Sequence, residues 1–305
     1  STTKKAGRNQ PIRFNYGTTN TLSSPAELPQ KATTRQFVEA LSDFGVNNYF
    51  AGQEVNRWLE LLDSHENDPG SLTYLQDPVS GENYPIAFDA DNNTYYPLED
   101  SDIIGDFLND EGFSTIHNLG VSGGGENLSF RINGGYSFED GIMVTDKDKF
   151  KKYNINAYLG ADISPRLKST TNIFYRRSDQ SLAIAQYSSA IQLRGYDPTG
   201  FFETEAGEVL PFASPGNVVR YRTPSTTNVN NLRLFQSMEF SLAKNFKIIG
   251  EYTFEKRFTR TEAVNNGVIF ASTFRFVPNL TAENAFAQSR LSRGNNETTY
   301  NSLNL

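Results

Sequence analysis

The stretch LSFRINGGYSF, residues 128–138, alternates apolar and polar side chains. Successive side chains of a β-strand point to opposite faces, so this alternation predicts a strand with one apolar and one polar face. The apolar face takes Leu128, Phe130, Ile132, Tyr136 and Phe138. The polar face takes Ser129, Arg131, Asn133 and Ser137. The stretch therefore predicts a long strand with one face toward an apolar medium and the other toward water.

The same division recurs in four later segments, residues 153–163, 167–176, 232–242 and 246–257. Charged side chains keep to the polar face through the middle of these strands. On that face we place the candidate lumen-facing residues Arg131, Arg176, Arg233, Glu239, Glu251 and Arg257, with Lys168 beside them. Further strand-like segments predict about eight strands, near Ile12, Ile116, Leu128, Tyr153, Leu167, Leu232, Phe246 and Tyr300, with one more between Gly267 and Val277.

Strand length and connection length together predict a membrane β-barrel. The strands run about ten residues or more, the length that a tilted strand needs to cross a bilayer, whereas strands of a soluble sandwich usually have five or six. Tight turns at 123–127, 164–166 and 243–245 alternate with long polar segments at 21–112 and 178–230. Outer-membrane barrels have this asymmetry of short periplasmic turns and long external loops. A large soluble β protein is the alternative.

Composition excludes several other classes of protein. An apolar fraction of 37% and a mean hydropathy of -0.52 exclude a helical membrane protein, because a spanning helix needs about 20 apolar residues in a row. The formal net charge of -7 argues against nucleic acid as a partner. The absence of cysteine excludes disulfides and thiolate chemistry. Aromatic residues near the strand ends fit an interfacial girdle: Tyr136, Phe138, Tyr153, Phe174, Tyr175, Tyr252 and Phe258.

Several short motifs stand in a fixed order along the first half of the chain. TTKKAG at residues 2–7 precedes a short strand, IRFNYG at 12–17. HNLGVSGG at 117–124 is followed by FRINGGY at 130–136 and by EDGI at 139–142. KFKKYN at 149–154 enters the next strand.

These motifs resemble the plug-to-barrel junction and first barrel strands of SusC/RagA-type TonB-dependent transporters. The likeness covers the first few residues and roughly residues 115–178, and Ala6 departs from it, because the family often has glycine directly at that point. The resemblance implies an incomplete antiparallel transmembrane β-barrel, the front part of a 22-stranded barrel. Residues 1–10 would end the plug and 11–305 would start the barrel, with 18–113 a long extracellular loop. We expect a fragment, because no signal peptide precedes residue 1 and a strand is interrupted at Leu305.

The resemblance also implies location in the bacterial outer membrane and active import of an oligosaccharide, glycan or peptide. A SusD-like surface lipoprotein would cap the barrel, and the TonB complex would act through the N-terminal plug. Two alternatives stay open: a siderophore or cobalamin receptor on the same barrel, and a soluble β-rich binding or structural protein. The polar-face charges named above line the transport path, or they have a structural role, in which they form wall salt bridges or hold the plug.

The first long connection is predicted to carry two helices. Phe37, Val38, Leu41 and Phe44 share one helical face, with Thr33 or Thr34 as N-cap, and Val55, Trp58, Leu59 and Leu62 share another. The long loops also hold aromatic residues that look exposed and are mixed with Asn, Arg and Asp, and sugar rings stack on such side chains. The alternative is that these aromatic rings pack against each other. The candidate substrate-binding residues are Tyr95, Tyr96, Tyr196, Phe201, Phe202 and Tyr221.

No residue pattern predicts an enzyme. The two histidines, His65 and His117, lack metal-ligand spacing, and His117 is expected on the barrel surface near a membrane interface. Asp89 to Asn93 resembles part of a calcium loop, but Thr94 and Asp100 replace the glycine and final glutamate that an EF-hand needs, so a solvated turn is expected. We therefore predict no catalytic, cofactor-binding or metal-binding residues.

Overall fold

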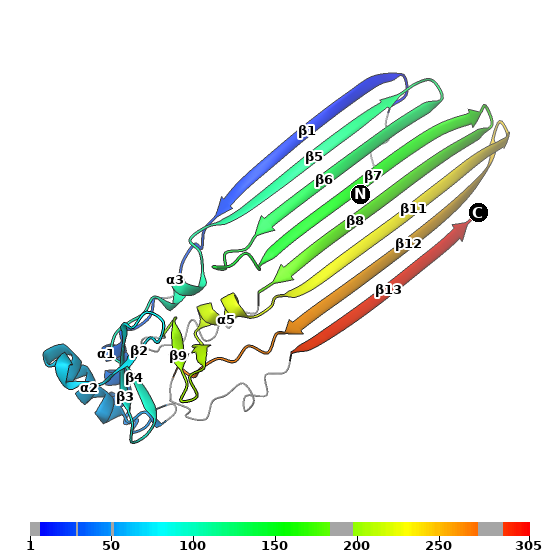
Figure 1. Ribbon diagram of the computed structural model, residues 1–305. Helices are drawn as coiled ribbons and strands as arrows, with labels where there is room; N and C mark the ends of the chain where they lie inside the picture. The colour runs from blue at the N-terminus through cyan, green and yellow to red at the C-terminus, as the bar shows by residue number, and fades with distance from the viewer. Residues whose placement is uncertain (1–6, 29, 50–51, 184–197, 274–288) are drawn as a thin grey trace.

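The computed structural model describes residues 7–28, 30–49, 52–183, 198–273 and 289–305, and its main feature is one antiparallel sheet of eight strands. Figure 1 shows the strands side by side. In order across the sheet they are β1 (Gln10–Ser23), β5 (Gly112–Gly124), β6 (Leu128–Asp140), β7 (Lys149–Ser164), β8 (Leu167–Leu182), β11 (Ser225–Ala243), β12 (Phe246–Asn265) and β13 (Arg290–Asn304). Each of the eight strands expected from the sequence is present. The extra strand expected near 267–277 is not seen in the described part of that range, where Ala271 forms only an isolated bridge with Phe212.

The connections alternate in length as expected (Figure 1). Residues 125–127, 165–166 and 244–245 make the tight turns at one end of the sheet, and the long connections all lie at the other end. The strands extend further than the sequence indicated: β8 continues to Leu182 and β11 begins at Ser225, so the predicted loop 178–230 shrinks to 183–224. The first long connection likewise runs from 24 to 111. Ladder hydrogen bonds hold these strand ends although their sequence is polar.

The register separates two faces, here called the apolar face and the polar face. Ile132, Ala157, Ile173 and Leu234 follow one another across β6, β7, β8 and β11 on the apolar face. Arg131, Tyr158 and Asn172 do so on the polar face. The apolar face is uncovered, with exposed fractions such as 77% for Phe14, 58% for Leu119 and 51% for Ile155. An eight-stranded sheet with an exposed apolar face is typical of a protein whose sheet contacts lipid rather than water.

Aromatic rings form a row on the apolar face toward the long connections. Tyr16, His117, Tyr136 and Tyr153 lie next to one another on four adjacent strands, with ring centroids 6.1, 6.1 and 5.1 Å apart. The Tyr16 hydroxyl is 2.8 Å from His117 Nδ1. His117 thus lies where an interfacial residue was expected. Phe174 was wrongly assigned to this girdle: it lies on the polar face, beneath the Arg233 guanidinium at 5.7 Å.

The long connections fold into a compact unit, which we call the loop body. Its elements are α1 (Thr34–Asp43), α2 (Val55–Asn67), the 3-10 turn η2 (Pro69–Ser71), β2 (Tyr74–Gln76), β3 (Asn83–Asp89), β4 (Thr94–Pro97), α3 (Ile103–Phe107), β9 (Phe201–Glu203), β10 (Val209–Pro211) and α5 (Pro215–Tyr221). Among the described residues, no helix is long and apolar enough to span a membrane.

Both helices predicted in the first connection are present. Thr33 caps α1 through a capping box, in which the Gln36 amide donates to Thr33 Oγ1 at 3.1 Å and the Thr33 amide donates to Gln36 Oε1 at 3.1 Å. Phe44 was wrongly placed on the buried face of α1. It is the C-cap residue and is 85% exposed, because the chain leaves the helix there into Gly45, whose φ is +70°.

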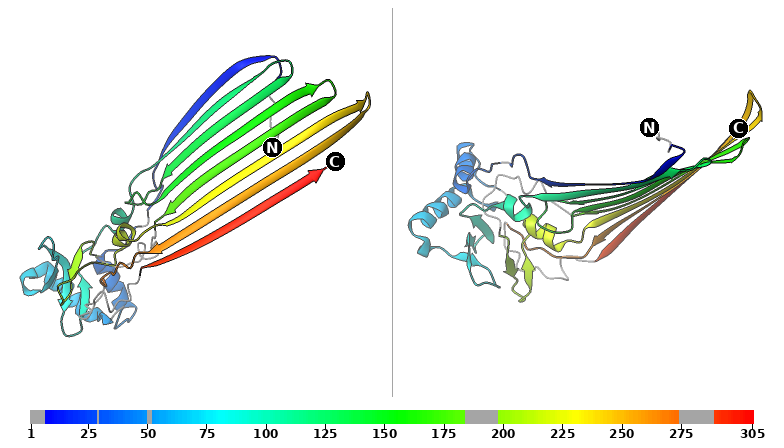
Figure 2. Two further views of the ribbon diagram at one scale, coloured as in Figure 1. Left: turned by 45° about the vertical axis from the view of Figure 1, so that its right-hand side comes forward. Right: turned by 90° about the horizontal axis from the view of Figure 1, so that it is seen from above.

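Three apolar clusters hold the loop body together. The first lies within the connection 24–111 and is centred on Trp58, Val38 and Tyr96. The second joins three different connections, since Tyr95, Phe212 and Ala271 belong to one cluster. The third joins Phe107 to Met143 and Val219. Segments far apart in the sequence therefore form one body at the end of the sheet (Figure 2).

Candidate functional site

The six candidate lumen-facing residues all lie on the polar face. Arg176 and Arg257 flank Asn231 in one register row. Arg233 lies one row nearer the tight turns, opposite Phe174 and Glu255. Glu251 is opposite Ser237, and Glu239 is opposite Lys168. The alternation of apolar and polar side chains along the strands was therefore sufficient to predict that these six residues share one face.

The part of the polar face near the tight turns carries charges of both signs. Lys247 Nζ is 2.6 Å from Glu239 Oε1, and Asp162 is opposite Lys168 in the register. Arg8 forms a two-pronged ion pair with Asp162, which fixes the segment before β1 to the sheet. A cavity of about 350 Å³ lies among these groups. Since Arg8, Asp162, Lys168 and Glu239 each have an opposite charge beside them, this zone fits the structural alternative of wall salt bridges.

The middle of the polar face is dominated by arginine. Asn231 Nδ2 donates to Glu255 Oε1 at 3.2 Å, and Arg233 stacks on Phe174. Arg176 Nε and Asn231 Oδ1 are buried without a hydrogen-bond partner among the described residues. Buried polar atoms without partners retain the capacity to bind a ligand or a neighbouring segment.

We expect the Arg8–Asp162 pair to anchor the segment before β1. Asp162→Arg places two like charges together and is expected to speed amide exchange of residues 7–10 about two- to fivefold, since exposed pairs are worth little. The Asn9 amide, which donates to Gly125 O at 3.2 Å, reports the change. Hydrogen–deuterium exchange of the full-length protein measures it. The double variant Arg8→Asp/Asp162→Arg should restore the slow rate; equal exchange in all three proteins would contradict the anchoring role.

The structure places the loop aromatics differently from one another. The expectation that Tyr95 and Tyr96 are exposed is wrong: they are 1% and 0% exposed, because all four residues of β4 are buried within the loop body. Burial raises the pKa of both hydroxyls. Phe202 is 7% exposed in the same core. No sugar can stack on rings that the protein already covers.

The other aromatic candidates remain nearer the surface. Phe201 meets Tyr221 edge-on at 6.2 Å, and Tyr221 is 38% exposed. Tyr196 lies outside the described residues. The binding role predicted for Phe201, Tyr221 and Tyr196 stays a prediction.

A half-buried hydrogen-bond chain ties the connection 24–111 to β9 in the connection 183–224. The Tyr84 hydroxyl donates to Asp77 Oδ2 at 2.5 Å, and the Phe201 amide donates to the Tyr84 oxygen at 2.9 Å. Burial opposes the charge of Asp77, but the hydrogen bonds from Tyr84 and from the backbone amides of Val79 and Ser80 outweigh it and lower the pKa of Asp77. The carboxylate is therefore ionised and structural.

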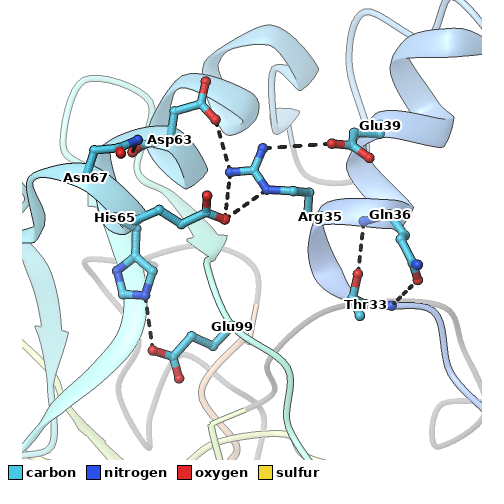
Figure 3. Close-up of polar contacts among 9 residues, drawn as sticks. Thr33, Arg35, Gln36, Glu39, Asp63, His65, Asn67 and Glu99 are labelled. Atoms are coloured by element: carbon cyan, nitrogen blue, oxygen red, sulfur yellow. Dashed lines mark hydrogen bonds and ion pairs between the residues drawn. The ribbon is translucent and has the colours of Figure 1, made fainter.

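A cluster of charged and hydrogen-bonded side chains joins α1, α2 and the segment after β4 (Figure 3). Arg35 of α1 pairs with Asp63 at 3.0 Å and with Glu66 at 2.8 Å on α2. His65 Nε2 is 3.0 Å from Glu99 Oε1, and its Nδ1 is 2.8 Å from the Tyr74 hydroxyl. Arg35 thus joins α1 to α2, and both ring nitrogens of His65 are engaged in contacts that join α2 to Tyr74 and Glu99.

Metal-binding geometry is not found in the part of the chain that the structure describes. No group of three or more His, Asp or Glu side chains there is arranged to hold a metal ion. The Asp89 carboxylate accepts from the Asp91 amide at 3.0 Å and from Asn92 Nδ2 at 3.2 Å. These bonds close the β3–β4 turn, as the sequence led us to expect.

Comparisons with known proteins relate the chain to TonB-dependent receptors and importers. Over 146 residues, 48% of this chain, the sequence is 25% identical to a TonB-dependent receptor P3 of Formosa agariphila. The structure of the RagAB peptide importer in its closed-closed state matches 90% of this chain with a TM-score of 0.60 at 15% identity. The open-open state of the same importer matches 98% with a TM-score of 0.57 at 12% identity. The resemblance to SusC/RagA-type TonB-dependent transporters is confirmed.

The likeness covers only part of those larger proteins. The match spans 13% of the curated receptor and 31% and 33% of the two importer chains. No protein-family model matches the chain. The sheet nevertheless has the fold of one part of a RagA-type barrel, an incomplete antiparallel transmembrane β-barrel.

Two arginines, Arg222 and Arg290, lie near each other in a way that the sequence did not indicate. Arg222 directly follows α5 and Arg290 begins β13, and both line one cavity at the end of β12 beside Asn265. Arg290 lies ten residues before Tyr300 in β13, and side chains an even number of residues apart share one face of a strand. Arg290 therefore lies on the polar face, as Tyr300 does. No local pattern indicates that Arg222 joins it.

Proposed function

We propose that the full-length protein is an outer-membrane TonB-dependent transporter that imports a nutrient, an oligosaccharide or a peptide, together with a SusD-like surface lipoprotein. The observation that carries this proposal is the eight-stranded sheet with an exposed apolar face and with all long connections at one end. A soluble β protein would bury that face. The aromatic row of Tyr16, His117, Tyr136 and Tyr153 marks the outer interface with lipid.

In this proposal residues 1–10 end the plug, and the sheet forms the front part of the barrel wall. The loop body then lies on the extracellular side, where a lipoprotein partner would contact it. The TonB complex would act on the plug, and the transmitted work would displace it from the polar face. The ion pair between Arg8 and Asp162 supports a junction at this point.

Fractionation of cells that express the full-length protein tests the proposal. We expect the protein in the outer membrane, with electrophoretic mobility that changes on heating, and a surface lipoprotein that co-purifies in mild detergent. Uptake of the partner's ligand should stop when TonB is removed. A soluble protein would overturn the proposal. A TonB-dependent barrel without a lipoprotein partner would favour the siderophore or cobalamin alternative.

A further inference from the structure

A cavity of about 500 Å³ opens where the outer ends of β12 and β13 meet the segment that follows α5. Its lining includes Arg222, Asn265, Asn266, Arg290 and Ser292. In Figure 1 this is the junction between the sheet and the loop body. The cavity is therefore at the mouth of the proposed barrel.

The register shows which face the cavity lies on. Asn265 is opposite Arg290, and Ala263 is opposite Ser292. Counting by twos along β12 from Arg257 reaches Ala263 and Asn265, so these lining residues continue the polar face. The cavity is thus on the side that a transported molecule would pass.

Hydrogen bonds hold the cavity wall in place. Asn266 Nδ2 donates to Tyr221 O at 2.8 Å, and the Gly267 amide donates to Asn265 Oδ1 at 3.1 Å. Asn266 Oδ1 is buried and has no hydrogen-bond partner among the described residues. The first arginine, Arg222, stacks on Phe270 with 5.4 Å between the guanidinium carbon and the ring centroid. This stacking fixes the direction of the guanidinium group.

Neither guanidinium group of the cavity has a carboxylate partner in the described part of the chain. The neighbouring acid, Glu262, belongs to the apolar-face side of β12 and accepts from Arg260 and from Arg293, the latter at 2.6 Å. Within the described residues these two guanidinium groups line one cavity without a counter-ion, although the net charge of the chain is -7. Further along the same face lie Arg257 and Arg176.

We propose that Arg222 and Arg290 bind a carboxylate of the imported molecule at the mouth of the barrel. The planar fork of a guanidinium group matches the two oxygens of a carboxylate. The inference rests on the proposed transport function and narrows its substrate to molecules that carry a carboxylate. That group belongs either to a peptide or to an acidic sugar.

Binding to the full-length protein in detergent tests this inference. Two pairs of probes are used: a mixture of tripeptides with free or amidated C-termini, and trigalacturonate with free or methyl-esterified carboxyls. The variant Arg222→Gln/Arg290→Gln removes both charges from the cavity. The control Arg260→Gln/Arg293→Gln removes the same number of charges from the other face of β12 and β13.

We expect a free-acid probe to bind at least about tenfold more tightly than its neutral form, as hydrogen bonds to charged groups allow. The cavity variant should lose that preference and the control should keep it. The peptide and sugar arms tell which source supplies the carboxylate. Equal binding of acid and neutral probes, no binding of either acid, or an unchanged preference in the cavity variant would overturn the inference. TonB-dependent import of neutral cargo alone would leave the transport proposal intact while removing this one.

Discussion

Truncation of Trp58 to alanine is expected to open the first core of the loop body. Trp58 is 1% exposed, its Nε1 donates to Pro97 O at 2.6 Å, and its ring meets Tyr96 edge-on at 5.9 Å. Removing a buried tryptophan costs about 3–5 kcal/mol, because the cavity left behind fills only partly. The Pro97 carbonyl also loses its donor.

Limited trypsin digestion of the full-length protein in outer membranes measures this effect. We expect rapid cleavage at Lys31, Arg35 and Arg57 in Trp58→Ala and slow cleavage in the parent protein. Phe44→Ala is the matched control, since that aromatic ring belongs to the same body but is 85% exposed. The barrel itself should keep its heat-dependent mobility in both variants. Equal protection of Trp58→Ala and the parent would show that this core does not hold the loop body together.

Replacing Ile173 by arginine is expected to destabilise the barrel by about 2–4 kcal/mol, the cost of a lipid-facing cation near the middle of a bilayer. Ile173 is 42% exposed on the apolar face, between Ala157 of β7 and Leu234 of β11. Its neighbours in the row offer no group that hydrates a charge. The guanidinium group would have to draw water or headgroups into the membrane.

Asn172→Arg is the control for this prediction, because the adjacent side chain lies on the polar face and lines an open cavity with Thr253. The amount of heat-modifiable protein in outer membranes reports folding of each variant. We expect a large loss for Ile173→Arg and little for Asn172→Arg. Similar losses in both, or in neither, would contradict the assignment of the two faces. A soluble protein would tolerate a cation at Ile173, whose side chain is already exposed.

The alternation of side chains determined most of the sheet. A period of two is a property of consecutive residues, so Leu128 to Phe138 is enough to define a strand and its faces. The tight turns then define antiparallel neighbours, and the polar-face positions of Arg131, Arg176 and Arg257 follow. The capping box of Thr33 and Gln36 is equally local, which is why α1 was predicted with its N-cap.

Contacts between distant segments required the tertiary structure. Gln236 interrupts the apolar face of β11, and only the register shows that Thr171 Oγ1 donates to its oxygen at 2.6 Å while its nitrogen donates to Ser169 Oγ at 2.9 Å. These bonds satisfy the amide where the medium cannot.

Contacts between distant segments of the loop body were also not predictable from the local sequence. An aromatic residue in a polar connection has the same local sequence whether it is exposed or buried, so the burial of Tyr95 and Tyr96 depended on Trp58 and Phe212, which other segments supply. Arg222 and Arg290 likewise line one cavity only because the fold brings the start of β13 beside the segment that follows α5. The sequence by itself determined the strands and their two faces, since both are local. Tertiary packing alone decided which loop residues are covered and which remain open to a ligand, because those contacts join residues far apart in the chain.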